Sequence, residues 1–270
     1  MAFKLGDLII DRIVEGVGEV ASGDNEGKLL YRLTNLQEAS LTVTADSVDA
    51  VDGTGAVIKT FYRGKTGEFT ATNSTLSLPV IEQMSGTAAK YAGAGDDAIV
   101  MPMIITSSKK TGIELPGITD TSIADHKLVA HVVSKNGTLG RQIATANLTI
   151  TSGSPSTLEI TGGSSDETMF IIKYNRTVTE DGILIQNQSD KFPKTHKLTL
   201  KVLIVDPCEP DIIRAAYIVL PSFQPSAEID FTVSTDATLD FSGVMQTSYC
   251  GTEKVLYEIY VCADDEEDAA

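Results

Sequence analysis

The sequence predicts an all-β fold, an antiparallel β-sandwich or barrel with a long hairpin and one short flanking α-helix. Apolar and polar residues alternate with a period of two over many short segments, as half-buried strands require. Gly, Pro, Asn and Asp separate these segments at short spacing, which is typical of sandwiches and barrels. Helical patterns are scarce along the 270 residues.

The clearest alternation lies in residues 198–204, 228–234 and 255–261, where every second side chain is apolar. The same reasoning predicts strands in ten further segments: 41–52, 56–63, 68–78, 99–106, 127–134, 147–151, 168–174, 183–189, 212–220 and 239–248.

The turn Asp52-Gly53-Thr54-Gly55 stands between two of these segments and is a strong hairpin signal, because glycine adopts positive φ at little cost. We expect its arms to form a long ribbon that ends near Asp46 and Arg63. A second turn at residues 64–67 would lead into another strand and give a three-strand meander.

One short helix is predicted after Pro79, because a proline at its start and Gly86 at its end follow the usual asymmetry of helix termini. Residues 207–213 could hold a further helical turn. Residues 16–27 are predicted to be a mobile loop, and residues 106–125 a long irregular stretch.

We expect one β-domain over residues 1–262, with an elaboration within residues 152–194 and a disordered acidic tail at residues 263–270. The weak seam at residues 152–156 does not resemble an extended linker.

The formal charge of −16 argues against adhesion to nucleic acid, because binding to phosphates depends on Lys and Arg releasing counterions. It also disfavours an anionic membrane surface. The sequence predicts no membrane anchor, since no stretch approaches the ~20 apolar residues that span a bilayer.

No pattern in the sequence predicts an enzyme, a cofactor or a metal site. Residues 16–21 match a loose dinucleotide pattern, but the following Ser-Gly-Asp-Asn cannot continue as the required helix. His126, His131 and His196 lack metal-ligand spacing, and no G-x-S-x-G nucleophile elbow occurs.

The basic residues Lys59, Arg63 and Lys65 border the predicted hairpin. Two interpretations stay open: they form a solvated face of the ribbon, or they pair with acidic groups on a neighbouring subunit.

In its layout the sequence resembles the tail tube (major tail) proteins of long-tailed bacteriophages. The long ribbon at residues 48–62, the strand before Pro79 and the short helix after it fit the family's N-terminal hairpin region. The C-terminal part is similar over residues 201–208, 214–221, 230–233, 238–246 and 249–257.

The resemblance implies a structural virion protein, assembled in the host cytoplasm, that forms stacked and commonly hexameric rings. The hairpin residues Asp52, Gly53, Thr54, Gly55, Lys59, Arg63 and Lys65 would bridge subunits or rings. Implied partners are identical copies, the tape-measure protein, the tail sheath, and baseplate or terminator proteins. Genomic DNA would pass through the tube as cargo that does not adhere.

Acidity suits such a conduit, because a wall that repels a polyanion lets it pass. Candidate carboxylates for the lumen alternate with apolar residues on predicted strands, and they are Asp46, Asp49, Asp52, Glu228 and Asp230. The alternative is that they face outward or pair with Lys and Arg. The alternative for the whole chain is an immunoglobulin-like binding or decoration module of a virion or cell surface.

Overall fold

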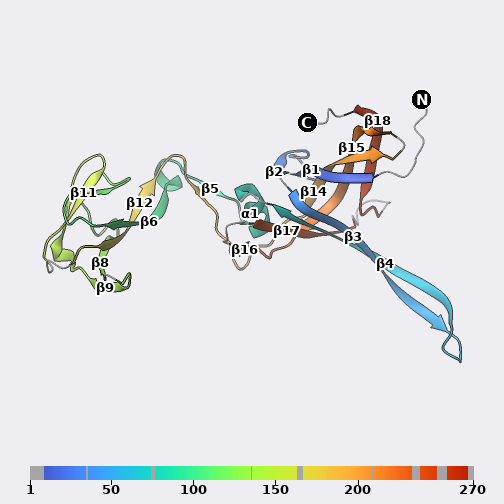
Figure 1. The fold of residues 1–270 in the computed structure, drawn as a ribbon, viewed down its shortest axis with the longest axis horizontal. Coiled ribbons are helices and arrows are strands. Elements are labelled where there is room, and N and C mark those ends of the chain that lie inside the picture. Colours follow the sequence, from blue (N-terminus) through green and yellow to red (C-terminus); the bar gives the residue numbers. More distant parts are fainter. Residues whose placement is uncertain are drawn as a thin grey trace. The chain divides into compact units, whose positions relative to one another are not determined.

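The computed structural model describes residues 9–34, 36–73, 77–134, 136–162, 167–207, 209–232, 238–247 and 254–266. It is mostly strand, with antiparallel sheets, and so confirms the predicted all-β fold. The chain divides into two compact units (Figure 1). Unit 1 comprises Met1–Ala88 and Ile185–Ala270, and unit 2 comprises Ala89–Leu184.

The large sheet of unit 1 follows the order β2-β1-β14-β15-β17-β4-β3, with β16 beside β17 and β18 beside β15. Its strands are β1 (Ile9–Glu19), β2 (Leu29–Thr34), β3 (Leu36–Val51), β4 (Val57–Asn73), β14 (His196–Asp206), β15 (Glu209–Pro225), β16 (Phe231–Thr232), β17 (Thr238–Met245) and β18 (Glu258–Glu266). The long β15 pairs with β14 and β18 through its first part and with β17 through Phe223–Pro225.

Helix α1 (Leu78–Ser85) is the short helix that the sequence predicts, with Pro79 in its first turn and Gly86 as its C-cap. Its apolar side chains Val80, Ile81 and Met84 are buried in the core of unit 1. This contact positions the helix against the sheet, and α1 also touches β2.

The hairpin is longer than predicted, and the expected meander is wrong. β4 runs without a break through residues 64–67, and a register shift beside Arg63 takes up the extra residue as a bulge. At Gly67, β4 approaches β17 closely: a Cβ there would lie 2.4 Å from the Cε and 3.2 Å from the Cβ of Met245, so a larger residue would require the Met245 side chain to shift.

Three other local predictions are corrected. Residues 16–19 of the expected mobile loop belong to β1, which is paired on both sides. Residues 209–213 continue β15 where a helical turn was an option. Of the alternating segment 228–234, residues 228–230 precede the strand Phe231–Thr232, and the Ser226 hydroxyl accepts the Glu228 amide there; residues 233–234 lie outside the described residues.

The acidic tail is also shorter than expected. Residues 263–266 continue β18, where Glu266 is the partner of Arg214 in β15. Residues 267–270 lie outside the described residues.

Aromatic rings fill the core of unit 1. Phe223 contacts Phe69, Phe241 and His196 at centroid distances of 6.2, 5.6 and 5.6 Å. His196 is 2% exposed: the Tyr31 hydroxyl donates to its Nε2 over 2.6 Å, and its Nδ1 donates to the Lys194 carbonyl over 3.2 Å. Both ring nitrogens are thereby satisfied in the neutral form, and burial lowers the pKa of His196.

We expect unit 1 to lose stability as the pH falls below about 6.5, the ordinary pKa of histidine in an unfolded chain. The unfolded state binds a proton that the buried imidazole resists, so the loss continues down to the folded pKa, by at most about 1.4 kcal/mol per pH unit. Urea unfolding of H196Q beside the parent at pH 7.5 and 5.5 measures the effect. An unchanged pH dependence in H196Q would assign the acid sensitivity to other groups.

Unit 2 has its own core between two small sheets, ordered β6-β12-β8-β9 and β10-β11-β7. Its strands are β5 (Lys90–Tyr91), β6 (Ile99–Ser107), β7 (Ile113–Leu115), β8 (Val129–Val133), β9 (Leu139–Gln142), β10 (Leu148–Thr151), β11 (Ser156–Ile160), β12 (Phe170–Val178) and β13 (Ile183–Leu184). The 3₁₀ turns η1 (Gly95–Asp97) and η2 (Thr145–Asn147) connect some of them. Phe170, Ile172 and Tyr174 from β12 are fully buried in this core.

The entry and exit of unit 2 lie side by side. β5 and β13 pair antiparallel, with Tyr91 opposite Ile183 and Lys90 opposite Leu184. The elaboration that the sequence placed within residues 152–194 therefore differs from the observed unit, which begins at Ala89. Sequence alternation is the same in both units, so it could not mark this boundary.

We expect excision of Ala89–Leu184 to leave a folded unit 1, because the two cut ends adjoin a strand pair and a short Gly-Ser linker can join them. Circular dichroism and a cooperative urea transition test this. A molten product that binds a hydrophobic dye would show that unit 1 depends on unit 2.

Candidate assembly surface

Residues 44–66 form a two-stranded ribbon, which we call the ribbon throughout. β17 accompanies β4 only from Gly67 onward, so the ribbon is held by the β3–β4 ladder alone (Figure 1). All its residues are exposed except the half-buried Thr60. A two-stranded hairpin without a third strand or a packed face is only marginally stable in water.

The turn at the tip is built by Asp52. Its Oδ1 accepts the Thr54 amide (2.8 Å), the Thr54 hydroxyl (2.7 Å) and the Ala56 amide (2.9 Å). These bonds, led by the Thr54 hydroxyl, lower the pKa of Asp52. Gly55 has φ +87°, a conformation that favours glycine, while Gly53 has open space around its Cβ position. The turn predicted at Asp52-Gly53-Thr54-Gly55 therefore forms the tip of the ribbon.

Both faces of the ribbon carry exposed apolar side chains. Phe61 lies opposite Val48, and the ammonium group of Lys59 lies 5.1 Å from the Phe61 ring centroid on that same face. Tyr62 lies opposite Ser47 on the other face and is 75% exposed, and Ile58 near the tip is 70% exposed. Such groups on both faces are typical of a segment that packs between partners.

The charged residues of the ribbon divide between its strands. Asp46 and Asp49 lie on β3, and the basic Lys59, Arg63 and Lys65 lie on β4. Asp49 accepts the Thr60 hydroxyl over 2.6 Å. Within the described residues, no ion pair of 4.0 Å or less involves a ribbon side chain. The ribbon is formally neutral, with three acids and three bases, although the chain as a whole carries −16.

The other two candidate acids lie elsewhere. Glu228 and Asp230 are exposed on the segment that leads into β16. The structure therefore does not bring all five candidate carboxylates together. Asp46, Asp49 and Asp52 lie on the ribbon, whereas Glu228 and Asp230 lie on the segment before β16. The sequence alone does not single out the exposed apolar side chains of the ribbon, which fit the alternation of a half-buried strand.

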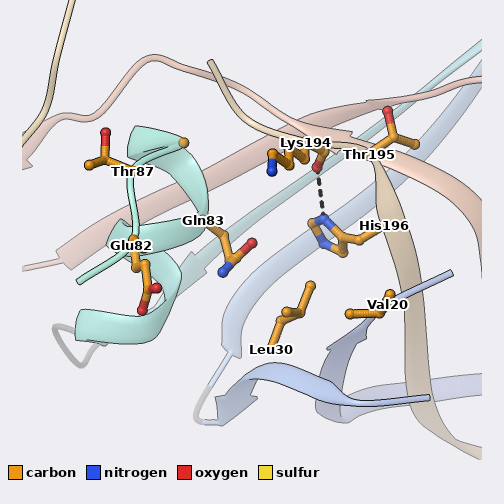
Figure 2. Close-up of a pocket in the computed structure, with 10 residues that line it drawn as sticks. Val20, Leu30, Glu82, Gln83, Thr87, Lys194, Thr195 and His196 are labelled. Carbon is orange, nitrogen blue, oxygen red and sulfur yellow. Dashed lines mark hydrogen bonds between the residues drawn. The ribbon is translucent and has the colours of Figure 1, made fainter. Parts of the chain in front are cut away.

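A pocket of about 360 Å³ lies between α1 and the start of β14 (Figure 2). Its lining mixes polar residues such as Glu82, Gln83 and Lys194 with the apolar Val20 and Leu30. The imidazole of His196 is held at its edge by the Lys194 carbonyl.

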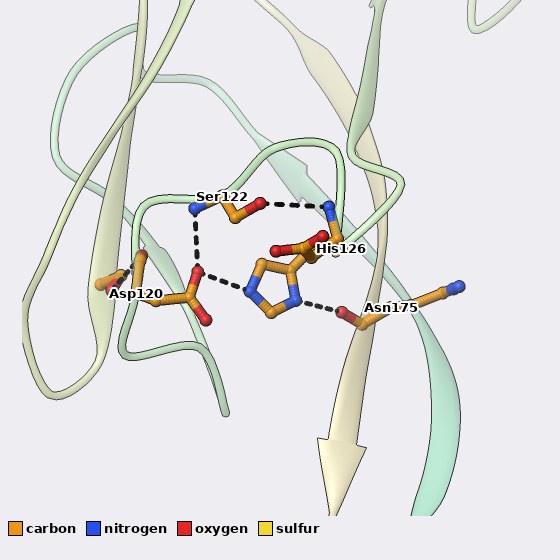
Figure 3. A network of polar contacts seen from close by, with 6 residues as sticks. Asp120, Ser122, His126 and Asn175 are labelled. Carbon is orange, nitrogen blue, oxygen red and sulfur yellow. Dashed lines mark hydrogen bonds and ion pairs between the residues drawn. The ribbon is translucent and has the colours of Figure 1, made fainter.

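Unit 2 contains a hydrogen-bonded Asp–His pair in the loop before β8. His126 Nε2 lies 2.8 Å from Asp120 Oδ1, and its Nδ1 lies 2.9 Å from the Asn175 carbonyl (Figure 3). The Ser122 hydroxyl accepts the Asp125 amide, and neither ring nitrogen bonds to a hydroxyl. The Ser122 amide and His126 lower the pKa of Asp120. The network fastens the loop before β8 to β12.

The described residues offer neither a metal site nor a membrane-spanning helix. They contain no group of three or more His, Cys, Asp or Glu side chains placed to hold a metal ion. No helix among them is both long and apolar enough to cross a membrane.

The antiparallel sheets, the flanking helix and the exposed ribbon together define an all-β protein with a two-stranded extension. The YomU/Tube protein family matches residues 12–246, and the chain belongs to this family, a family of phage tail tube proteins. The match includes unit 2 as well as the ribbon. A search of curated proteins finds no match to the chain. The family implies a structural component of the virion tail.

Proposed function

We propose that this chain assembles in the host cytoplasm into stacked hexameric rings, and that the resulting acidic tube conducts the phage genome during ejection. Its role in this proposal is structural and non-enzymatic. The main observation behind this proposal is the ribbon, which exposes apolar side chains on both faces and is not buried in the core of unit 1. Membership of the tail tube family supports the same conclusion.

Open strand edges support self-assembly. Among the described strands, β2 and β3 stand at the two ends of the large sheet order, so within this part of the chain each has a strand partner on one side only. Exposed edges promote pairing with other chains, and a closed ring of identical copies satisfies them.

The same tube would hold the tape-measure protein and meet the sheath and the baseplate or terminator proteins at its surfaces.

The charge supports a conduit that does not retain DNA. With 37 acidic and 21 basic residues, a hexameric ring would carry about 6 × −16 = −96 formal charges. We assign the lumen to some of Asp46, Asp49, Asp52, Glu228 and Asp230, all of which are exposed.

Negative-stain microscopy of the concentrated protein tests the proposal. Stacked rings with a central channel are expected, and a protein that stays monomeric under every solution condition contradicts it. The immunoglobulin-like alternative predicts instead a stable monomer that binds a glycan or a surface protein. The small two-sheet sandwich of unit 2 is the part of the chain that could serve as such a decoration.

Charge reversal separates the two groups of candidate lumen acids. If the ribbon lines the channel, D46K tubes retain double-stranded DNA in a salt-dependent way, whereas tubes of E228K with D230K do not. The opposite result assigns the lumen to the segment before β16. If neither variant retains DNA, these acids do not line the channel.

A further inference from the structure

Unit 1 has an apolar opening between its strands, which we call the core gap. It has a volume of about 530 Å³ and is lined by residues of β1, β3, β14, β15 and β18, together with Tyr257. Apart from Asp11 and Arg12 its lining is aliphatic or aromatic. Ile13, Leu41 and Ile218 pack against the buried core cluster, so the gap is continuous with the core.

The rim of the gap remains in contact with solvent. Ile10 is 63% exposed and Ile259 58% exposed, and Val43 at the foot of the ribbon is 37% exposed. Removing the remaining exposed apolar surface of these side chains from water is favourable. An apolar hollow of this kind favours an apolar occupant.

We propose that the core gap receives the ribbon tip of a second copy of this chain. The proposal rests on the proposed tube function and identifies where the ribbon binds. The tip, residues 51–58 with the neighbouring Phe61 and Tyr62, offers the branched side chains Val51, Val57 and Ile58 together with two aromatic rings. Buried aromatic and aliphatic anchors dominate the affinity of protein interfaces.

The chain cannot fill its own gap with its own tip. Val43 lies on the rim of the gap, and β3 continues for eight residues from there to Val51. A strand rises about 3.4 Å per residue, so the tip stands roughly 27 Å from the rim. Folding back would break the continuous β3–β4 ladder, whose pairs extend out to Val51 and Val57.

Charge is compatible with the contact. Two copies that each carry −16 repel one another overall, so an interface requires surfaces that are locally balanced. The ribbon as a whole has three acids and three bases, and its tip contributes a single charge, Asp52; the gap has one acid and one base, Asp11 and Arg12, which lie 3.7 Å apart. The pocket beside α1 and the hollow at Glu38 and Asp240 have more polar side chains in their linings than the gap and fit the tip less well.

The tip and the gap are different surfaces, so the contact is heterologous. A heterologous contact that does not close into a ring leaves one free tip and one free gap at the ends of the assembly, and it then propagates along a stack. This is the connectivity that a tube of indefinite length requires.

Aspartate substitutions at exposed positions test the pairing. I58D alters the tip, I10D and I259D alter the rim of the gap, and V244D is the matched control at a residue 49% exposed that does not line the gap. We expect the tip and rim variants to raise the critical concentration for polymerisation at least about tenfold, and V244D to leave it unchanged. Circular dichroism verifies that each variant is folded. If one of the two rim variants misfolds, the other is used in its place.

Mixing two defective variants gives the decisive result. An I58D copy keeps an intact gap and an I10D or I259D copy keeps an intact tip, so a mixture can form one productive contact. Analytical ultracentrifugation should show a 1:1 complex with twice the mass of the particle that either variant forms alone. No association in the mixture overturns the pairing of tip and gap.

The outcomes separate this inference from the proposed function. If the parent protein stays monomeric, the tube function fails and the inference fails with it. If the parent and both rim variants polymerise alike while I58D does not, the ribbon drives assembly but the core gap is not its receptor.

Discussion

Deletion of residues 46–63, with an Asn-Gly turn in their place, is expected to abolish polymerisation and leave a folded monomer. We expect the fold to be retained because the deleted segment is not part of the core: every residue in it is exposed except the half-buried Thr60. The remaining ladder from Val43 to Leu36 keeps its pairing with β4, which β17 supports on its other side. Because Ala45 lies opposite Lys65, the inserted Asn-Gly and Gly64 form a three-residue loop, and a glycine at its last position suits such a hairpin.

Size-exclusion chromatography and negative-stain microscopy at matched concentrations measure the loss. A length-preserving variant, F61S with Y62S, serves as the control because it removes the two aromatic side chains and keeps the strand pairing. We expect it to weaken assembly without abolishing it. Tubes of normal length from the deletion variant would show that the ribbon has no role in assembly.

Much of the ribbon could be predicted because its signals are local. The Asp52-Gly53-Thr54-Gly55 turn needs only the carboxylate of Asp52 and a positive φ at Gly55, and both lie within four residues. The helix after Pro79 is local in the same sense, since its proline and Gly86 mark its two ends. Signals of this kind do not depend on the rest of the fold.

Long-range features could not be predicted. The glycines at 64 and 67 suggested a turn, but Gly67 serves close packing against Met245, a residue far away in the sequence. Alternation cannot distinguish a strand that faces a core from one that faces a partner, so the exposed Phe61 and Ile58 resembled core residues.

The core gap depends on five strands and one loop residue from both halves of unit 1. No single segment of sequence contains it. The candidate acids show the same limit: Glu228 and Asp230 fit a strand by pattern, yet the Ser226 hydroxyl binds the Glu228 amide in a turn before β16.

The core aromatic cluster gives the largest expected change in stability. Phe223 is fully buried, and its ring contacts Phe69, Phe241 and His196. Truncation to alanine removes these contacts and leaves a cavity, which costs about 3–5 kcal/mol. For a unit of this size we expect the melting temperature of unit 1 to fall by roughly 6–20 °C.

Differential scanning calorimetry of F223A measures this shift. F192A is the matched control in the same unit, since Phe192 is 66% exposed and its loss leaves no internal cavity. F170A makes the equivalent truncation in the core of unit 2, where Phe170 is fully buried. If the two cores melt independently, F223A and F170A lower different transitions. A single transition lowered by both variants would mean that the units unfold together, and excision of Ala89–Leu184 would then destabilise unit 1 as well.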